Sequence, residues 1–236
     1  GNIQDFCAAF GAQHALAVVL DADSVMSARA VRRLVRVMQA HPQIGILQGL
    51  VVGLPAASVF TRLFQFGMRL GMRSYTLGSA WWQGDCGPFW GHNAVIRIAP
   101  FAEHCQLPEL KDRAGRPRSI LSHDQVEAAL MRRAGFEVRV YPLEDESFEE
   151  NPPNIMEFVA RDLRWCAGNL QYTRLLTLPG LTATSRMQLL LAILMFVGSP
   201  AWLILLAAMG WSVHQSSLSA AFYLPALAAV FGAVAL

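Results

Sequence analysis

Lysine is nearly absent from this sequence, and basic charge barely exceeds acidic charge. Lys111 is the single lysine among 19 basic residues, and the formal net charge at pH 7 is +2. We interpret the arginine bias as a property of the source genome. Because the basic residues are not interleaved with aromatic residues in runs, the sequence excludes bulk nucleic-acid binding.

Cysteine is scarce and shows no ligand spacing. The four cysteines, at positions 7, 86, 105 and 166, form no Cys-x-x-Cys pair. This spacing argues against a zinc site and against a disulfide framework. We therefore expect free thiols in a reducing compartment.

Charge disappears altogether after Arg186. Residues 187–209 form a run of 23 residues without Asp, Glu, Lys or Arg, which is long enough to span a bilayer. Gly198 and Pro200 interrupt this run, as membrane helices tolerate and soluble helices do not. The run predicts a transmembrane helix, and residues 218–236 predict a second one, truncated.

Basic residues flank only one side of the first predicted span. Arg174 and Arg186 precede it, whereas the connector 210–217 carries neither Lys nor Arg. By the positive-inside rule, residues 1–180 form a cytoplasmic domain and the connector lies outside. No signal peptide is visible, and we expect the chain to be a fragment cut at both ends.

The first 186 residues have the pattern of an α/β domain. Leu16–Leu20 predicts a strand buried on both faces of a parallel sheet. Ser27 is placed to cap a helix that ends at His41-Pro42, and residues 44–52 predict the next strand. This order implies a right-handed βαβ unit. Further strands are predicted over 94–98 and 137–141.

Two carboxylates follow the first predicted strand, at the sheet edge where open α/β sheets bind ligands. Asp21 and Asp23, separated by Ala22, can point the same way from an extended segment and offer hard oxygen ligands for Mg²⁺ or Mn²⁺. The alternative is a turn in which an Asp only caps the following helix.

Residues 55–75 predict a helix crowded with Phe, Leu and Met that also carries Arg62, Arg69 and Arg73. A core helix is one interpretation. The other is a helix over 55–80 in the membrane interface, with its aromatic side in the bilayer and its arginines toward phosphate headgroups.

An aromatic, glycine-rich stretch covers residues 81–93. It ends in Trp90, Gly91, His92 and Asn93. Aromatic faces beside polar amides suit a sugar acceptor site, although aromatic residues are also ordinary core material.

Ser122-His123-Asp124-Gln125 opens a predicted helix that closes at Gly135. Ser122 and Gln125 have the spacing of a capping box, which places Asp124 in the first turn. The helix dipole alone would favour a carboxylate there. The acidic run at 144–150 predicts a solvated loop.

A long helix is predicted to start at the cap Asn154. Arg161, Arg164, Trp165 and Gly168 follow at spacings that share one face. Two guanidiniums beside an indole suit an anionic ligand that carries a ring. The alternative is surface arginines beside a core tryptophan.

Taken in order, these motifs resemble those of processive inverting glycosyltransferases of the cellulose and hyaluronan synthase type. That family's motifs read D-x-D, T-E-D and Q-x-x-R-W before membrane helices. Here Asp21–Asp23, Ser122–Asp124 and Arg161–Trp165 stand at similar spacings. Gly1-Asn2 is similar to the end of its K-A-G-N segment, and 149–153 to its E-x-x-P-P.

Two positions depart from the family pattern. His123 stands where Glu is usual, and Arg161 stands where Gln is usual. Both departures, together with residues 90–97, resemble the branch that builds osmoregulated periplasmic glucans. The first uridine-binding Asp of the family would lie before Gly1.

The resemblance implies a GT-A-type α/β domain, incomplete at its N-terminus, followed by transmembrane helices of a multi-pass protein in the bacterial inner membrane. It implies Asp124 as general base, Asp21 and Asp23 as ligands of Mg²⁺ or Mn²⁺, and Arg161, Arg164 and Trp165 at the donor diphosphate and acceptor. UDP-glucose would be the donor. The growing β-glucan would be exported toward a periplasmic glucan-processing partner as synthesis proceeds.

Two other functions stay open at this point. A related membrane synthase would use another sugar nucleotide, such as an N-acetylglucosamine donor. A more distant alternative is a metal-sensing, non-enzymatic module of a transporter, which would require polar residues within the spans.

Overall fold

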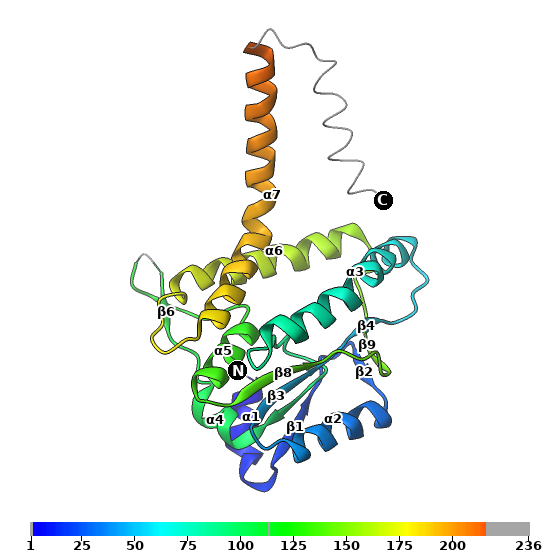
Figure 1. Ribbon diagram of the computed structural model, residues 1–236, viewed down its shortest axis with the longest axis vertical. Helices are drawn as coiled ribbons and strands as arrows, with labels where there is room; N and C mark the ends of the chain where they lie inside the picture. Colours follow the sequence, from blue (N-terminus) through cyan, green and yellow to red (C-terminus); the bar gives the residue numbers. More distant parts are fainter. Residues whose placement is uncertain (1, 113, 216–236) are drawn as a thin grey trace. The chain divides into compact units, whose positions relative to one another are not determined.

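The computed structural model describes residues 2–112 and 114–215. Its contacts divide the chain into two compact units, with the boundary between Ile193 and Leu194. The first unit is a mixed α/β domain (Figure 1). The unit extends past the predicted limit at residue 180 because the first turns of the last helix bury Ser185, Leu189 and Ile193.

The central sheet has four strands in the order β1-β5-β3-β8. They are β1 (Leu16–Val19), β5 (Ala94–Arg97), β3 (Ile44–Gly49) and β8 (Glu137–Tyr141). β3 and β8 are parallel, whereas β5 runs antiparallel to both β1 and β3. The predicted strands therefore exist, but the sheet is mixed.

The prediction for β1 is wrong in one respect. β1 is an edge strand paired with antiparallel β5, and it is not buried on both faces of a parallel sheet. Val18 is 37% exposed and Leu20 is 46% exposed. β1 and β3 do run in the same direction, as the strand–helix–strand order predicted, but β5 lies between them.

Helices cover both faces of this sheet (Figure 1). Side chains of β3 alternate, so that Leu47 joins a cluster with α2 (Ala28–Ala40), and Ile46 joins the larger core with α4 (Ile98–His104) and α5 (Asp124–Arg133). The larger core also receives α1 (Asn2–Phe10), which is followed by the short helix η1 (Gly11–Gln13). Ser27 caps α2 by accepting from the Ala30 N–H, as predicted.

A second, three-stranded sheet has the order β2-β9-β4. Its strands are β2 (Ser24–Met26), β9 (Ser147–Glu149) and β4 (Val52–Gly53), and a separate hairpin joins β6 (Leu110–Lys111) to β7 (Pro117–Arg118). The acidic run at 144–150, which contains β9, is not simply a solvated loop. Asp145 is buried and lies 3.3 Å from Arg29 and 3.2 Å from Arg33 of α2.

Helix α3 (Val59–Gln83) has its polarity inverted. Its buried residues are Thr61, Thr76, Ser79 and Gln83. One set of its large apolar side chains is exposed (Val59, Leu63, Phe66 and Leu70), whereas Phe60, Phe64, Met68 and Met72 are half-buried. Trp81, which the sequence placed in the aromatic stretch before residue 94, is 87% exposed on this helix. The interpretation of residues 55–75 as a core helix is therefore wrong for the stripe of Val59, Leu63, Phe66 and Leu70, which points away from the protein.

The chain continues through α6 (Ile155–Gln171), the short helix η2 (Tyr172–Arg174) and α7 (Ala183–Gln215). In the described residues, Ala183–Ser212 is the one helix long and apolar enough to cross a membrane. Since α7 continues to Gln215, most of the predicted connector 210–217 is helical. The second predicted span, 218–236, lies outside the described residues.

Candidate active site

Asp21 and Asp23 lie in a turn directly after β1. The Ser24 N–H donates to the Asp21 carbonyl at 3.1 Å, and the Glu150 N–H donates to the Asp23 carbonyl at 3.2 Å. Both aspartates are exposed. The turn is thus fixed through its backbone, which leaves both carboxylates accessible to a ligand.

Glu149 of β9 lies beside this turn, because β9 pairs with β2. His92 Nε2 is 3.4 Å from Glu149 Oε2, and His92 Nδ1 is 3.4 Å from Ser24 Oγ. Burial raises the pKa of Glu149 and the charge of Asp23 adds to that shift, while His92 and Arg161 oppose it. The site therefore gathers carboxylates whose negative charge is partly balanced by Arg161, with His92 in contact with one of them.

The loop at residues 90–93 is held by Gln48 of β3. The buried Gln48 side chain donates to the His92 carbonyl at 2.9 Å and accepts from the Trp90 N–H at 2.8 Å. Asn93 has a positive φ of 49° and is fully buried. Its amide donates to Ser147 Oγ at 2.8 Å, so Asn93 ties this loop to β9.

Asp124 is the first residue of α5 and packs against Gly91. Gly91 has a φ of 87°, and a Cβ atom there would collide with the Asp124 carboxylate. Burial raises the pKa of Asp124 to about 6, a shift that the charge of His123 opposes and the charge of Glu127 assists. The predicted capping box is wrong: the N-cap residue is His123, with no side-chain capping bond.

His123 lies between two carboxylates. Its Nδ1 is 3.2 Å from Asp124 Oδ1 and 3.2 Å from Glu127 Oε1. The interaction with Glu127 raises the pKa of His123 to about 9, against the opposing effect of burial. At neutral pH His123 is therefore an imidazolium, and it has no free lone pair on the atom that faces Asp124.

The C-terminal part of α6 holds the segment that leads into α5. Gly168 approaches Ser122 so closely that a Cβ atom would collide with the Ser122 hydroxyl. The Tyr172 hydroxyl donates to the Ser122 carbonyl at 2.7 Å, and Gln171 accepts from the Leu121 N–H at 2.9 Å. Helix α6 therefore fixes the position of Asp124 through the backbone that precedes it.

The same helix carries Arg161, Arg164 and Trp165. The Arg161 guanidinium lies over the Trp165 ring, 4.5 Å from its centroid. Burial lowers the pKa of Arg161, while Glu149 and Asp23 raise it. Trp165 is 42% exposed. The interpretation as surface arginines beside a core tryptophan is therefore wrong for Arg161 and Trp165. Arg164, by contrast, is exposed.

The structure brings Asp23, His92, Asp124 and Arg161 to one region. Sequence reasoning missed Gln48, Glu149 and Glu127, which position or charge that region. Gln48 gave no signal, because a glutamine inside an apolar strand shows no partner in the sequence. Glu149 appeared in the sequence as part of an acidic run and as the first residue of the segment similar to E-x-x-P-P, but neither pattern placed it in the site.

Two groups of side chains here have donor atoms suited to a divalent cation. Asp21 and Asp23 offer carboxylate oxygens that are exposed beside the half-buried Glu149, and this donor set fits Mg²⁺ or Mn²⁺. The second group is His123, Asp124 and Glu127, whose donor atoms lie within 4.8 Å of one another. A protonated His123 disfavours a cation there, because a metal ligand must be a neutral imidazole.

Comparisons with known proteins show which family model the chain matches. Residues 16–234 match the model of the family described as "Glycosyl transferase family group 2". The chain is similar to "Glucans biosynthesis glucosyltransferase H" of Rhodopseudomonas palustris strain BisA53, with 45% identity over 208 residues, which cover 88% of this chain and 29% of that protein.

Proteins of the same name from two other bacteria are also similar. The Caulobacter vibrioides strain NA1000 / CB15N protein is 41% identical over 88% of this chain and 31% of its own length. The Xanthomonas euvesicatoria pv. vesicatoria strain 85-10 protein is 39% identical over 95% of this chain and 35% of its own length. The chain therefore spans about a third of the length of these relatives.

Proposed function

The chain belongs to glycosyl transferase family group 2, and from this membership we propose that it transfers glucose from UDP-glucose to a growing β-glucan with inversion at the anomeric carbon. The observation that carries the proposal is the packing of Asp124 against Gly91, next to His92, which contacts Glu149 near Asp23 and Arg161, together with the relatives' common name. Membership of an enzyme family argues against the metal-sensing module.

Asp124 is the residue that we propose as general base. A carboxylate whose pKa is about 6 is ionised at neutral pH, yet it is basic enough to accept a proton from an acceptor hydroxyl. His123 cannot take this role near neutral pH, because it already carries a proton. Inversion in one step then needs no covalent intermediate on the enzyme.

Asp23, assisted by Asp21, is proposed to hold a divalent cation at the donor diphosphate. When bound, such a cation neutralises charge on the leaving UDP. Arg161 and Arg164 would add positive charge beside the diphosphate, and the exposed face of Trp165 would stack on the acceptor sugar. His92 and the backbone of Trp90 to Asn93 line the approach of that acceptor to Asp124.

Donor choice tests the proposal directly. Inside-out membrane vesicles that contain the intact protein should incorporate labelled glucose from UDP-glucose when Mg²⁺ is present. They should not incorporate sugar from UDP-N-acetylglucosamine. Incorporation of N-acetylglucosamine without glucose would instead favour the related synthase, and absence of transfer from either donor would contradict the enzymatic proposal.

We also propose that α3 lies on the membrane surface and that α7 spans it, with the α/β domain on the cytoplasmic side. The exposed stripe of α3 includes Val59, Leu63, Phe66 and Leu70, all at least 66% exposed. The rest of the protein does not bury these side chains. Burying them in a bilayer would remove their apolar area from water. Export toward a periplasmic glucan-processing partner would follow from this topology.

A polarity-sensitive dye tests the membrane contact. A dye attached to Leu70→Cys should shift to shorter emission wavelength when the protein is reconstituted into a bilayer. A dye at Arg36→Cys on α2 should not shift, because that residue belongs to the exposed polar face of a helix packed on the sheet. Equal shifts at both positions would contradict the assignment.

A further inference from the structure

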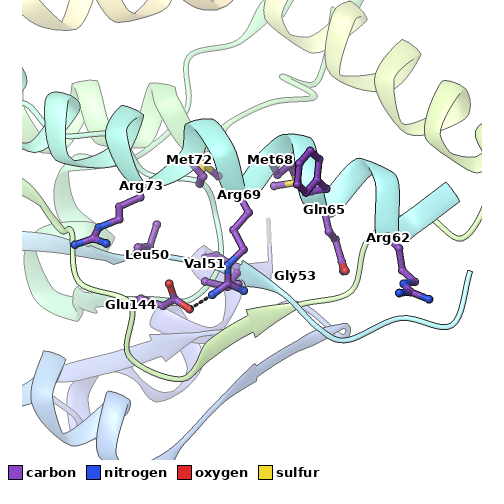
Figure 2. A pocket seen from close by; sticks show the side chains of 12 residues that line it. Leu50, Val51, Gly53, Arg62, Gln65, Met68, Arg69, Met72, Arg73 and Glu144 are labelled. Atoms are coloured by element: carbon purple, nitrogen blue, oxygen red, sulfur yellow. Dashed lines mark hydrogen bonds and ion pairs between the residues drawn. The ribbon is translucent and has the colours of Figure 1, made fainter. Parts of the chain in front are cut away.

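A cavity of about 430 Å³ lies along α3 and is not lined by the residues of the Asp23 turn. Leu50, Val51 and Gly53 form one side of it, and α3 forms the other (Figure 2). In the small sheet, β9 separates β4, which borders this cavity, from β2, which follows Asp23. The cavity is therefore not part of the proposed transfer site.

Three guanidiniums line this cavity. Arg62, Arg69 and Arg73 extend from one side of α3 toward the Leu50–Gly53 segment (Figure 2). Arg69 forms an ion pair with Glu144 at 2.6 Å. Within residues 2–112 and 114–215, no carboxylate lies within 4.0 Å of Arg62 or Arg73. The cavity thus has positive charge in excess, in the planar form that matches phosphate oxygens.

Apart from Gln65 and Glu144, the rest of the lining is apolar and adaptable. Met68 and Met72 face the same cavity as Leu50, and Met side chains fit irregular apolar groups. With 3.6 residues per turn, the row of arginines runs beside the exposed apolar stripe of α3, not opposite it. Phe66 belongs to that stripe and also lines the cavity. A ligand with a phosphate and an apolar part would match both features.

We propose that this cavity binds phosphate groups at its two ends, one at Arg62 and one at Arg73, which lie eleven residues apart on α3, and that anionic phospholipids are their source. The choice of a lipid rests on the membrane contact proposed for α3. If that contact exists, the arginine row lies at the level of the headgroups while the apolar stripe enters the acyl region. Binding of a phosphate group by the arginines does not depend on the membrane contact, because it requires only the cavity.

The selectivity of the protein for anionic lipid tests whether a phospholipid supplies the phosphate. The full chain is reconstituted into nanodiscs of phosphatidylcholine mixed equally with phosphatidylglycerol, and the motionally restricted fraction of each spin-labelled lipid is measured. The Arg62→Gln/Arg73→Gln variant should lose phosphatidylglycerol selectivity by roughly twentyfold, because each arginine near an anionic surface contributes a factor of about five. Glu144→Gln should increase the selectivity, since it frees Arg69.

The matched control is Arg32→Gln/Arg36→Gln, which removes two exposed charges from α2 and should leave selectivity unchanged. Titration with inorganic phosphate in detergent tests whether the cavity binds free phosphate. Phosphate binding that is lost only in the Arg62/Arg73 variant would support the site. That result would hold even if the dye on Leu70→Cys showed no membrane contact. If the Arg62/Arg73 and Arg32/Arg36 double variants behaved identically in both experiments, the phosphate-site proposal would be overturned. The proposed glucosyltransferase function does not depend on that result.

Discussion

Replacing Asp124 by Asn should lower turnover by about 10²- to 10⁴-fold while donor binding changes little. The amide keeps the shape of the carboxylate at the first position of α5 but cannot accept the acceptor's proton. Steady-state kinetics with UDP-glucose, together with equilibrium UDP binding, measures both quantities. Turnover above about a tenth of the wild-type value would rule out Asp124 as the base.

His123→Gln is the matched control, and it should have the smaller effect. If His123 were the base, the two variants would exchange their effects. The structure favours Asp124, because Glu127 raises the pKa of His123 to about 9 and keeps it protonated.

Stability separates this role from simple helix capping. A pKa raised from 3.8 to about 6 means that folding disfavours the ionised form of Asp124. The carboxylate therefore reduces stability above about pH 6, and this effect fades as the pH falls toward 4. At pH 7 the Asp124→Asn protein should unfold at the same temperature or higher, whereas loss of a favourable dipole interaction would lower that temperature.

The pH profile provides a further readout of the same residue. Turnover of the wild-type protein should fall about tenfold per pH unit below about pH 6, where Asp124 becomes protonated. The residual activity of Asp124→Asn should lack this acidic limb. A limb near pH 4 in the wild type would instead indicate an unperturbed carboxyl group.

Replacing Asp23 by Ala should abolish transfer and weaken metal-dependent UDP binding by roughly a hundredfold or more, since even outer partners of metal ligands are worth 10- to 100-fold in affinity. The fold should persist, because Asp23 is exposed and its structural hydrogen bond uses the backbone carbonyl. Titration of UDP with and without Mg²⁺ measures this effect.

Asp5→Ala removes another exposed carboxylate, from α1, and should leave UDP binding unchanged. The affinity of Asp21→Ala for UDP in the presence of Mg²⁺ should lie between those of Asp5→Ala and Asp23→Ala if Asp21 assists Asp23. Undiminished metal-dependent binding in Asp23→Ala would remove Asp23 from the metal site.

Local signals in the sequence predicted individual elements well. The caps Ser27 and Asn154 begin helices where they were expected, and Gly135 follows α5 with a φ of 94°. These features depend on residues a few positions apart. The pairing of β5 between β1 and β3 depends on contacts between distant segments, so a strand pattern alone could not predict it.

The orientation of α3 could not be predicted for a different reason. Helical periodicity shows that apolar residues share a face, but not whether that face meets the protein or another apolar phase. The buried Thr61 and Thr76 decide between these possibilities only when the fold is known.

In the site, the motif residues Asp23, Asp124 and Arg161 were predictable because their spacing resembles that of a known family. The partners of these residues were not. Glu149 and His92 are 57 positions apart and meet only because β9 pairs with β2 beside the 90–93 loop. Glu127 is four residues from His123, a helical spacing that could have predicted their ion pair.

The stereochemistry of the product tests the central claim most directly. UDP-glucose carries its glucose in the α configuration, so a single displacement assisted by Asp124 must give a β-linked product. Nuclear magnetic resonance of the glucan made from ¹³C-labelled UDP-glucose reports the anomeric configuration of each new linkage. We predict β linkages throughout, and α-linked glucose would contradict the proposed mechanism.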